Sequence, residues 1–146
     1  MIQAAKRLEH LLLEMGSRLH RISEERSTHR PAPGKWSKKE ELGHLIDSAA
    51  NNHQRFVRMQ IDNAIPLLQY QQAEWVSLQH YHSMSWAAIV RFWEVYNAHL
   101  LHVMRHIDET KLGNTGTFPE YGTQTLQFIL DDYVVHMEHH LKSILG

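Results

Sequence analysis

The fold is indicated most clearly by the stretch Trp36-Ser37-Lys38-Lys39-Glu40-Glu41-Leu42-Gly43-His44-Leu45-Ile46-Asp47. Ser37 and Glu40, three residues apart, form a capping box, in which each side chain accepts a backbone N–H at the start of a helix. The helix that begins here is predicted to end near Gln60, and its apolar residues recur at helical spacing. These residues are Leu42, Leu45, Ile46, Ala49 and Phe56.

Three further segments show the same helical spacing of apolar residues. The first covers residues 8–22, the second follows a cap at Ser83 or Ser85, and the third begins near Thr123 or Thr125. Each has one apolar stripe, so each needs a partner surface on which to bury it. Four amphipathic helices of this length favour a four-helix bundle.

The connections between these helices differ in length and composition. Proline and glycine exclude helix from residues 23–34 and make residues 110–122 an irregular loop. Residues 61–82 form a long crossover between the second and third helices, within which residues 71–78 fit a short helix. No segment shows the alternation of a strand. We therefore expect an all-α four-helix bundle with one long crossover, forming a single domain over residues 1–146.

The composition is that of an ordinary globular chain with one unusual feature. The chain has a formal net charge of -1, which leaves no basic surface for nucleic acid, and no cysteine, which excludes disulfides and thiolate metal sites. No signal peptide is recognisable, and no apolar run approaches the ~18 residues that a bilayer requires. We expect a cytoplasmic protein that binds a small molecule, with no nucleic-acid or membrane partner. The unusual feature is histidine, with 13 copies in 146 residues.

Two histidines of the last predicted helix, His136 and His140, are four residues apart and therefore share one helical face. Both flank the apolar stripe, as His44 does on the second helix, so all three are placed near the bundle interior, where a neutral imidazole needs a partner. Asp47 and Asp132 stand one turn from His44 and His136 and could each accept the second N–H of a ligating imidazole. The pattern favours one divalent metal ion bound by the three histidines.

The other histidines are interpreted as surface or packing residues. His99, His102 and His106 form a rival set on the third helix, but they lie opposite its apolar stripe. His139 points further from the stripe than its neighbours and is expected to face solvent or to lie beside the site. The signature of zinc metalloproteases is absent, because no glutamate follows His136 directly.

Five large aromatic residues divide into two groups. Trp93, Tyr96 and Tyr133 fall at helical spacing and are interpreted as core residues. Tyr70 and Trp75 lie in the predicted crossover, where they could cover a pocket. We therefore expect this second pair to contact a cofactor or substrate.

Taken together, these motifs resemble those of the DinB-like superfamily, over nearly the whole chain. The matching residues are Trp36-Ser37-x-x-Glu40-x-Leu42-Gly43-His44-Leu45-Ile46-Asp47, Asn51-Asn52-His53-x-Arg55-Phe56, Tyr70-x-x-x-x-Trp75, Tyr96-Asn97-x-His99-Leu100 and Tyr133-x-x-His136-x-x-x-His140-Leu141-x-x-Ile144. The resemblance implies a four-helix bundle with a long crossover after the second helix. It also implies that His44, His136 and His140 bind a metal, usually zinc or nickel, and that the chain forms a homodimer.

The activities known in that superfamily are thiol-dependent transfers, including conjugation of bacillithiol or a similar thiol and a mycothiol-dependent isomerisation, and other members are described as metal-dependent hydrolases. Three histidine ligands leave a coordination position open, which is typical of a catalytic site. The favoured hypothesis is an S-transferase, in which a low-molecular-weight thiol loses its proton at the metal and attacks an electrophile, while Arg55 binds the carboxylates of the thiol.

Two alternatives remain open. The metal could lower the pKa of a bound water to ~7 and supply a hydroxide for hydrolysis, with Asp47 or Asp132 as the general base. The metal could instead be structural or vestigial, and the chain a non-catalytic metal-binding or interaction protein.

Overall fold

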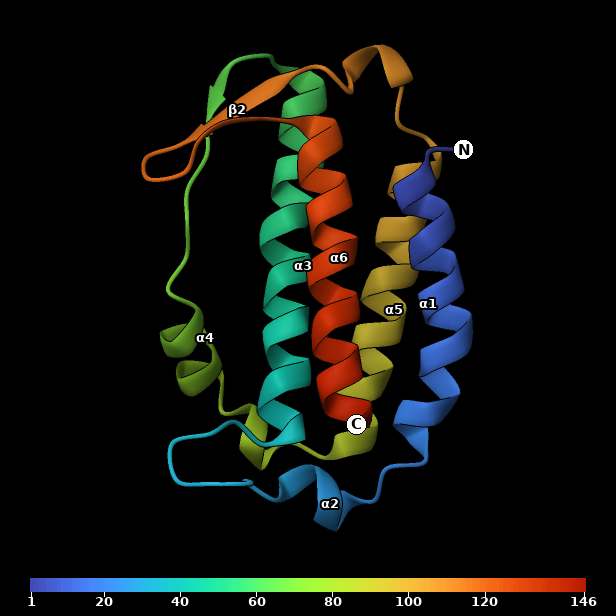
Figure 1. Ribbon diagram of the computed structural model, residues 1–146, viewed down its shortest axis with the longest axis vertical. Coiled ribbons are helices and arrows are strands. Elements are labelled where there is room, and N and C mark those ends of the chain that lie inside the picture. The colour runs from blue at the N-terminus through green and yellow to red at the C-terminus, as the bar shows by residue number, and fades with distance from the viewer.

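A computed structural model describes residues 1–146 and is predominantly helical (Figure 1). In chain order its elements are α1 (Gln3–His20), α2 (Glu24–Thr28), α3 (Lys38–Ile61), β1 (Ile65–Pro66), α4 (Gln72–Gln79), η1 (Tyr81–Ser83), α5 (Trp86–Arg105), η2 (Glu109–Lys111), β2 (Thr115–Phe118), β3 (Gly122–Thr125) and α6 (Leu126–Leu145). The four long helices, α1, α3, α5 and α6, pack as the predicted four-helix bundle. None of the helices has both the length and the apolar character needed to cross a membrane.

The order of packing in the bundle explains the need for a crossover. Helix α3 packs against α5 and α6, and α1 also packs against α5 and α6, so that the order around the bundle is α1, α5, α3, α6. Figure 1 shows that α1 and α6 run in one direction and that α3 and α5 run in the other. Because α3 and α5 are consecutive long helices that run in parallel, residues 62–85 must return along the whole bundle. This return places α4 outside α3.

The start of each central helix follows from its cap. The capping box at Ser37 is confirmed: its Oγ accepts the Glu40 N–H at 3.3 Å, and the Glu40 carboxylate accepts the Ser37 N–H at 3.0 Å. Of the alternatives expected for the later helices, Ser85 caps α5 and Thr125 caps α6. The apolar stripe predicted for α3 is buried throughout. The rotation of α3 is therefore set by this stripe, which also carries His44 inward.

The core contains one polar network among its apolar side chains. Tyr133 donates its hydroxyl hydrogen to Asn97 Oδ1 at 2.5 Å, and Asn97 donates to the Trp93 carbonyl at 2.9 Å. Phe56 packs edge-on against the Tyr133 ring, with centroids 5.5 Å apart. Since all four residues are buried, the network fixes α3, α5 and α6 relative to one another.

The expectation of an irregular loop at residues 110–122 is wrong, as is the expectation that the chain lacks strands. Strand β2 pairs in parallel with β1, where Ile65 lies opposite Gly116, and in antiparallel fashion with β3. The physical reason is the alternation along β2, in which Gly116 and Phe118 are buried whereas Thr115 and Thr117 lie on the other face, as suits a short pleated segment. Leu67 packs onto Gly116, where a Cβ atom would lie 2.4 Å from its Cδ1 atom.

The prediction that residues 23–34 contain no helix is also wrong, because residues 24–28 form α2. Ser23 caps α2 by accepting the Arg26 N–H at 3.1 Å. The helix ends at Thr28, before Pro31, so the prolines limit its length rather than prevent it. The short helix expected within the crossover is confirmed as α4.

Candidate metal centre

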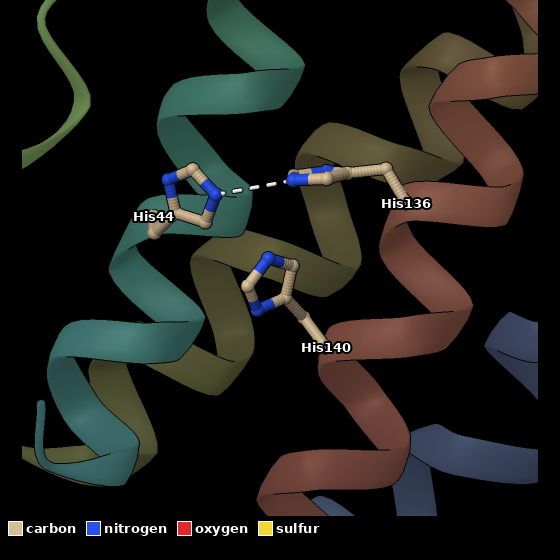
Figure 2. Close-up of side chains that lie close together, drawn as sticks. All are labelled: His44, His136 and His140. Atoms are coloured by element: carbon tan, nitrogen blue, oxygen red, sulfur yellow. Dashed lines mark hydrogen bonds between the residues drawn. The ribbon is translucent and has the colours of Figure 1, made fainter.

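Three histidine side chains meet between α3 and α6 (Figure 2). His44 projects from α3 towards His136 and His140, which project from α6 one turn apart. The Nε2 atoms of His44 and His136 are 3.2 Å apart. Each of the three residues offers a ring nitrogen, and these nitrogens lie within 4.8 Å of one another. No other group of three histidine or acidic side chains in the chain meets this criterion.

The spacing of these nitrogens suits a shared transition-metal ion. Two nitrogens bound at ~2.05 Å are about 3.3 Å apart at a tetrahedral angle and about 2.9 Å apart at a right angle. The 3.2 Å separation of His44 and His136 lies between these values. The widest separation in the cluster exceeds the ~4.1 Å that two ligands of one ion can span, so one imidazole must rotate slightly on binding. A cluster of imidazoles without thiolates suits transition-metal ions such as zinc, copper, iron and nickel.

Burial keeps two of these imidazoles, His44 and His136, in the neutral form that a metal requires. His44 is 1% exposed, and desolvation together with the neighbouring His136 and His140 lowers the pKa of His44 to about 3. Desolvation, with His140 and His139 nearby, lowers the pKa of His136 to about 4. At neutral pH both side chains therefore present a nitrogen lone pair rather than a positive charge.

The carboxylate that orients a histidine here is Glu41, which the sequence reasoning missed. His140 Nδ1 donates to Glu41 Oε2 at 2.8 Å, so its Nε2 atom is left to bind a metal. Ser143 in turn donates to the other carboxylate oxygen at 3.2 Å. Glu41 precedes His44 by three residues, and this helical spacing was the available signal.

Asp47 lies near the cluster but makes no hydrogen bond to His44. Its Oδ1 atom accepts from Tyr81 Oη and from Gln79 Nε2, each at 2.7 Å, whereas its Oδ2 atom is buried without a partner. Burial raises the pKa of this carboxyl group. The Nδ1 atom of His44 is likewise buried without a partner, and its ring lies 5.1 Å from that of Trp36. Asp47 therefore ties the crossover to α3 in this arrangement.

A pocket of about 640 Å³ adjoins the cluster on the side of His136. It lies between α3, the crossover, the β2–β3 hairpin and α6. Of the residues singled out in the sequence, Arg55, Tyr70, Asp132 and His136 line it. Trp75 does not line it but packs edge-on against Tyr70, with centroids 5.2 Å apart. Asp132 is exposed on the pocket wall and makes no hydrogen bond to His136.

The remaining candidate histidines lie on the surface. His99, His102 and His106 are exposed on or at the end of α5, and His139 is exposed on α6. The rings of His102 and His106 are 4.4 Å apart, and His106 Nδ1 lies 2.8 Å from the His102 carbonyl oxygen. The ring of His139 packs edge-on against that of His140, with centroids 5.4 Å apart, but none of the four residues belongs to the three-histidine cluster.

The depressed pKa values predict that the metal-free protein loses stability in mild acid. Below about pH 6.5 an unfolded chain takes up protons on His44 and His136, whereas the folded chain does so only towards pH 3 to 4. The free energy of unfolding should therefore fall as the pH decreases from 6.5 to 4, by up to about 1.4 kcal/mol per pH unit for each histidine. Urea unfolding at a series of pH values measures this slope. A His44→Gln, His136→Gln double variant with the same slope as the wild type would contradict the expectation.

Comparison with known proteins identifies structures with a similar architecture. A comparison with curated protein sequences finds no match. Among solved structures, the fold is similar to YfiT from Bacillus subtilis, described as "a probable metal-dependent hydrolase with an unusual four-helix bundle topology", with a TM-score of 0.86, 17% identity, and coverage of 97% of this chain and 82% of that chain. It is also similar to a mutant of a mycothiol-dependent maleylpyruvate isomerase, with a TM-score of 0.80, 10% identity and coverage of 97% of this chain and 59% of that chain.

At these identities the two structures establish the fold alone. The assignment to a family comes from the sequence, which matches the pattern of one superfamily over residues 4–144 and so over almost its whole length. The chain belongs to the DinB superfamily.

Proposed function

We propose that the protein is a metal-dependent S-transferase, with zinc or nickel held by His44, His136 and His140 and a low-molecular-weight thiol as co-substrate. The observation that carries this proposal is the position of His136. Its side chain belongs both to the histidine cluster and to the wall of the 640 Å³ pocket. A metal held by these three residues would therefore lie beside a pocket that can admit a small molecule.

The metal would supply one chemical contribution, which is to lower the pKa of a thiol bound beside it. The residues of the chain supply the rest. Glu41 keeps the proton of His140 on Nδ1 and so keeps Nε2 directed into the cluster. The crossover, held to α3 by Tyr81 and Gln79 through Asp47, forms one side of the pocket.

Two of the three nearby carboxylates are engaged, which leaves only Asp132 as a free general base, and this favours thiol transfer over hydrolysis. Of the three nearby carboxylates, Glu41 is engaged by His140 and Asp47 accepts from Tyr81 and Gln79. A thiol that is deprotonated beside a metal needs no such base, whereas activation of water usually benefits from one.

Hydrolysis is the second candidate, because Asp132 lines the same pocket as His136 and precedes it by one helical turn. In that role Asp132 would accept the proton of the attacking water. The two functions differ in the substrate that each requires, and this difference allows them to be separated.

The test is turnover by the metal-loaded protein. 1-Chloro-2,4-dinitrobenzene with glutathione or cysteine probes thiol transfer, and 4-nitrophenyl esters without thiol probe hydrolysis. We expect turnover with thiol, lowered at least about a hundredfold in His136→Ala because that variant removes a ligand at the pocket wall. His102→Ala, at an exposed position on α5 outside the cluster, is the matched control and should retain activity. Thiol-independent ester cleavage, lost in Asp132→Asn, would establish the hydrolase instead. Bound metal with neither activity would contradict both.

A further inference from the structure

The guanidinium group of Arg55 is held rigidly at the pocket wall. Arg55 Nη2 donates to the Leu68 carbonyl at 2.8 Å, and Nη1 donates to Asn52 Oδ1 at 3.3 Å. Its Cζ atom lies 4.8 Å from the centroid of the Phe118 ring. These contacts come from α3, the crossover and the β2–β3 hairpin, so three sides of the pocket fix the position of one cation. They engage two of the five N–H donors of the guanidinium group and leave three free.

Arg55 forms no salt bridge with an acidic side chain, although its side chain is partly buried. Burial lowers its pKa, while Tyr70 and Asp132 oppose that change from a distance. No carboxylate oxygen lies within 4.0 Å of it, whereas Arg7, Arg30 and Arg105 each have such a partner. A desolvated cation without a counter-ion is unfavourable, and an anion that binds there removes that cost.

Aromatic side chains line the side of the pocket formed by the β2–β3 hairpin and the start of α6. Tyr121 at the hairpin and Phe128 on α6 line it although they are 70% and 48% exposed. Phe118, which is buried, completes this group beside Arg55. Exposed rings at a concave surface favour a ligand with a flat apolar part.

The pocket is lined by residues from different levels of α3 and α6. Arg55 follows His44 by eleven residues on α3, which corresponds to about 16 Å along the helix axis. Arg55 and His136 nevertheless line the same pocket. A ligand whose charged group contacts Arg55 must therefore be elongated if its other end is to approach the histidine cluster.

We propose that the pocket selects an elongated small molecule with a carboxylate bound by Arg55 and a flat apolar part against Tyr121, Phe128 and Phe118. The assignment of the other end as the reacting end rests on the proposed function, but binding itself does not. The carboxylate could belong to the thiol or to the electrophile that accepts it.

Binding of two matched probes tests the carboxylate subsite without any turnover. 4-Phenylbutyrate and its neutral amide have the same shape, and titration calorimetry with the metal-loaded protein measures both. The wild type should bind the acid at least about tenfold more tightly than the amide, since charge-assisted hydrogen bonds are the strong ones. Arg55→Gln should abolish that preference, and Arg55→Lys should retain part of it. Arg58→Gln, three residues along α3 at an exposed position, should behave as the wild type.

The outcomes separate the proposal from simple loss of folding. Equal binding of acid and amide by the wild type would overturn the proposal without reference to any variant. An undiminished preference in folded Arg55→Gln would do the same. Tyr121→Ala should weaken both probes by a similar factor, because it removes apolar contact and no charge, and an unchanged affinity for both would exclude the aromatic subsite.

Kinetic measurements distinguish the two sources of the carboxylate. If the thiol carries it, Arg55→Gln should raise the KM for N-acetylcysteine but not for 2-mercaptoethanol. If the acceptor carries it, the KM for 4-chloro-3-nitrobenzoate should rise, and that for 1-chloro-2,4-dinitrobenzene should not. Probe binding that persists in a protein without transferase activity would leave the carboxylate subsite intact and contradict only the proposed reaction.

Discussion

Replacing His44 by glutamine is expected to lower the affinity of the protein for zinc by at least about a thousandfold, more than the 10–100-fold that loss of an outer partner typically costs. His44 is the only member of the cluster on α3 and is almost completely buried. Its removal leaves only His136 and His140, both on α6, and eliminates the pair of Nε2 atoms that lie 3.2 Å apart in His44 and His136. Competition with a chromogenic chelator at pH 7.5 measures the change.

Two further variants make this a graded test of the site. Glu41→Gln should weaken zinc binding about 10–100-fold, because it removes the carboxylate that orients His140 but none of the ligands. His102→Gln should leave affinity unchanged, since its exposed ring lies on α5 and outside the cluster. A His44→Gln protein that binds zinc as tightly as the wild type would exclude the three-histidine centre.

Replacing Gly43 by alanine is expected to destabilise the protein by about 2–3 kcal/mol, in spite of the better helix propensity of alanine. A Cβ atom at this position would lie 2.3 Å from Cδ2 of Tyr81. Tyr81 cannot turn away easily, because it is buried and donates its hydroxyl hydrogen to Asp47. Either α3 or the end of the crossover must shift. Urea unfolding followed by circular dichroism measures the loss.

Gly16→Ala is the matched control on another helix. Its Cβ atom would meet only the carboxylate end of Glu94, at 3.1 Å, which is flexible enough to move. That variant should be neutral or slightly stabilising. Adding Tyr81→Ala to Gly43→Ala should recover part of the loss expected from the two single changes, because the steric overlap is then absent. Strict additivity of the two changes would show that the overlap is not the cause.

The sequence was sufficient to predict the elements whose signal is periodic. The apolar stripe of α3 determines which residues face inward, and His44 follows from its place beside Leu45. The meeting of this residue with His136 and His140 could be anticipated for the same reason, since all three flank buried stripes.

The remaining features depend on contacts between distant segments. Ile65 pairs with Gly116 across a separation of 51 residues, and a strand of two residues has no detectable period. Spacing alone places Glu41 and Asp47 equally, three residues on either side of His44. Their roles are decided by what approaches each, which is His140 from α6 in one case and Tyr81 from the crossover in the other. Neither approach can be derived from one helix.

Few residues of the crossover are buried, and this affects how ligands can enter the pocket. Among residues 62–80 only Leu67 and Val76 are buried, while both histidine-bearing helices are anchored along their whole length in the core. Segments with few buried apolar contacts open at a lower free-energy cost than the core does. The crossover is therefore expected to have a lower local stability than the helices that carry the histidines. The outer wall of the molecule can exchange between closed and open states while the inner cluster keeps the geometry that chemistry requires.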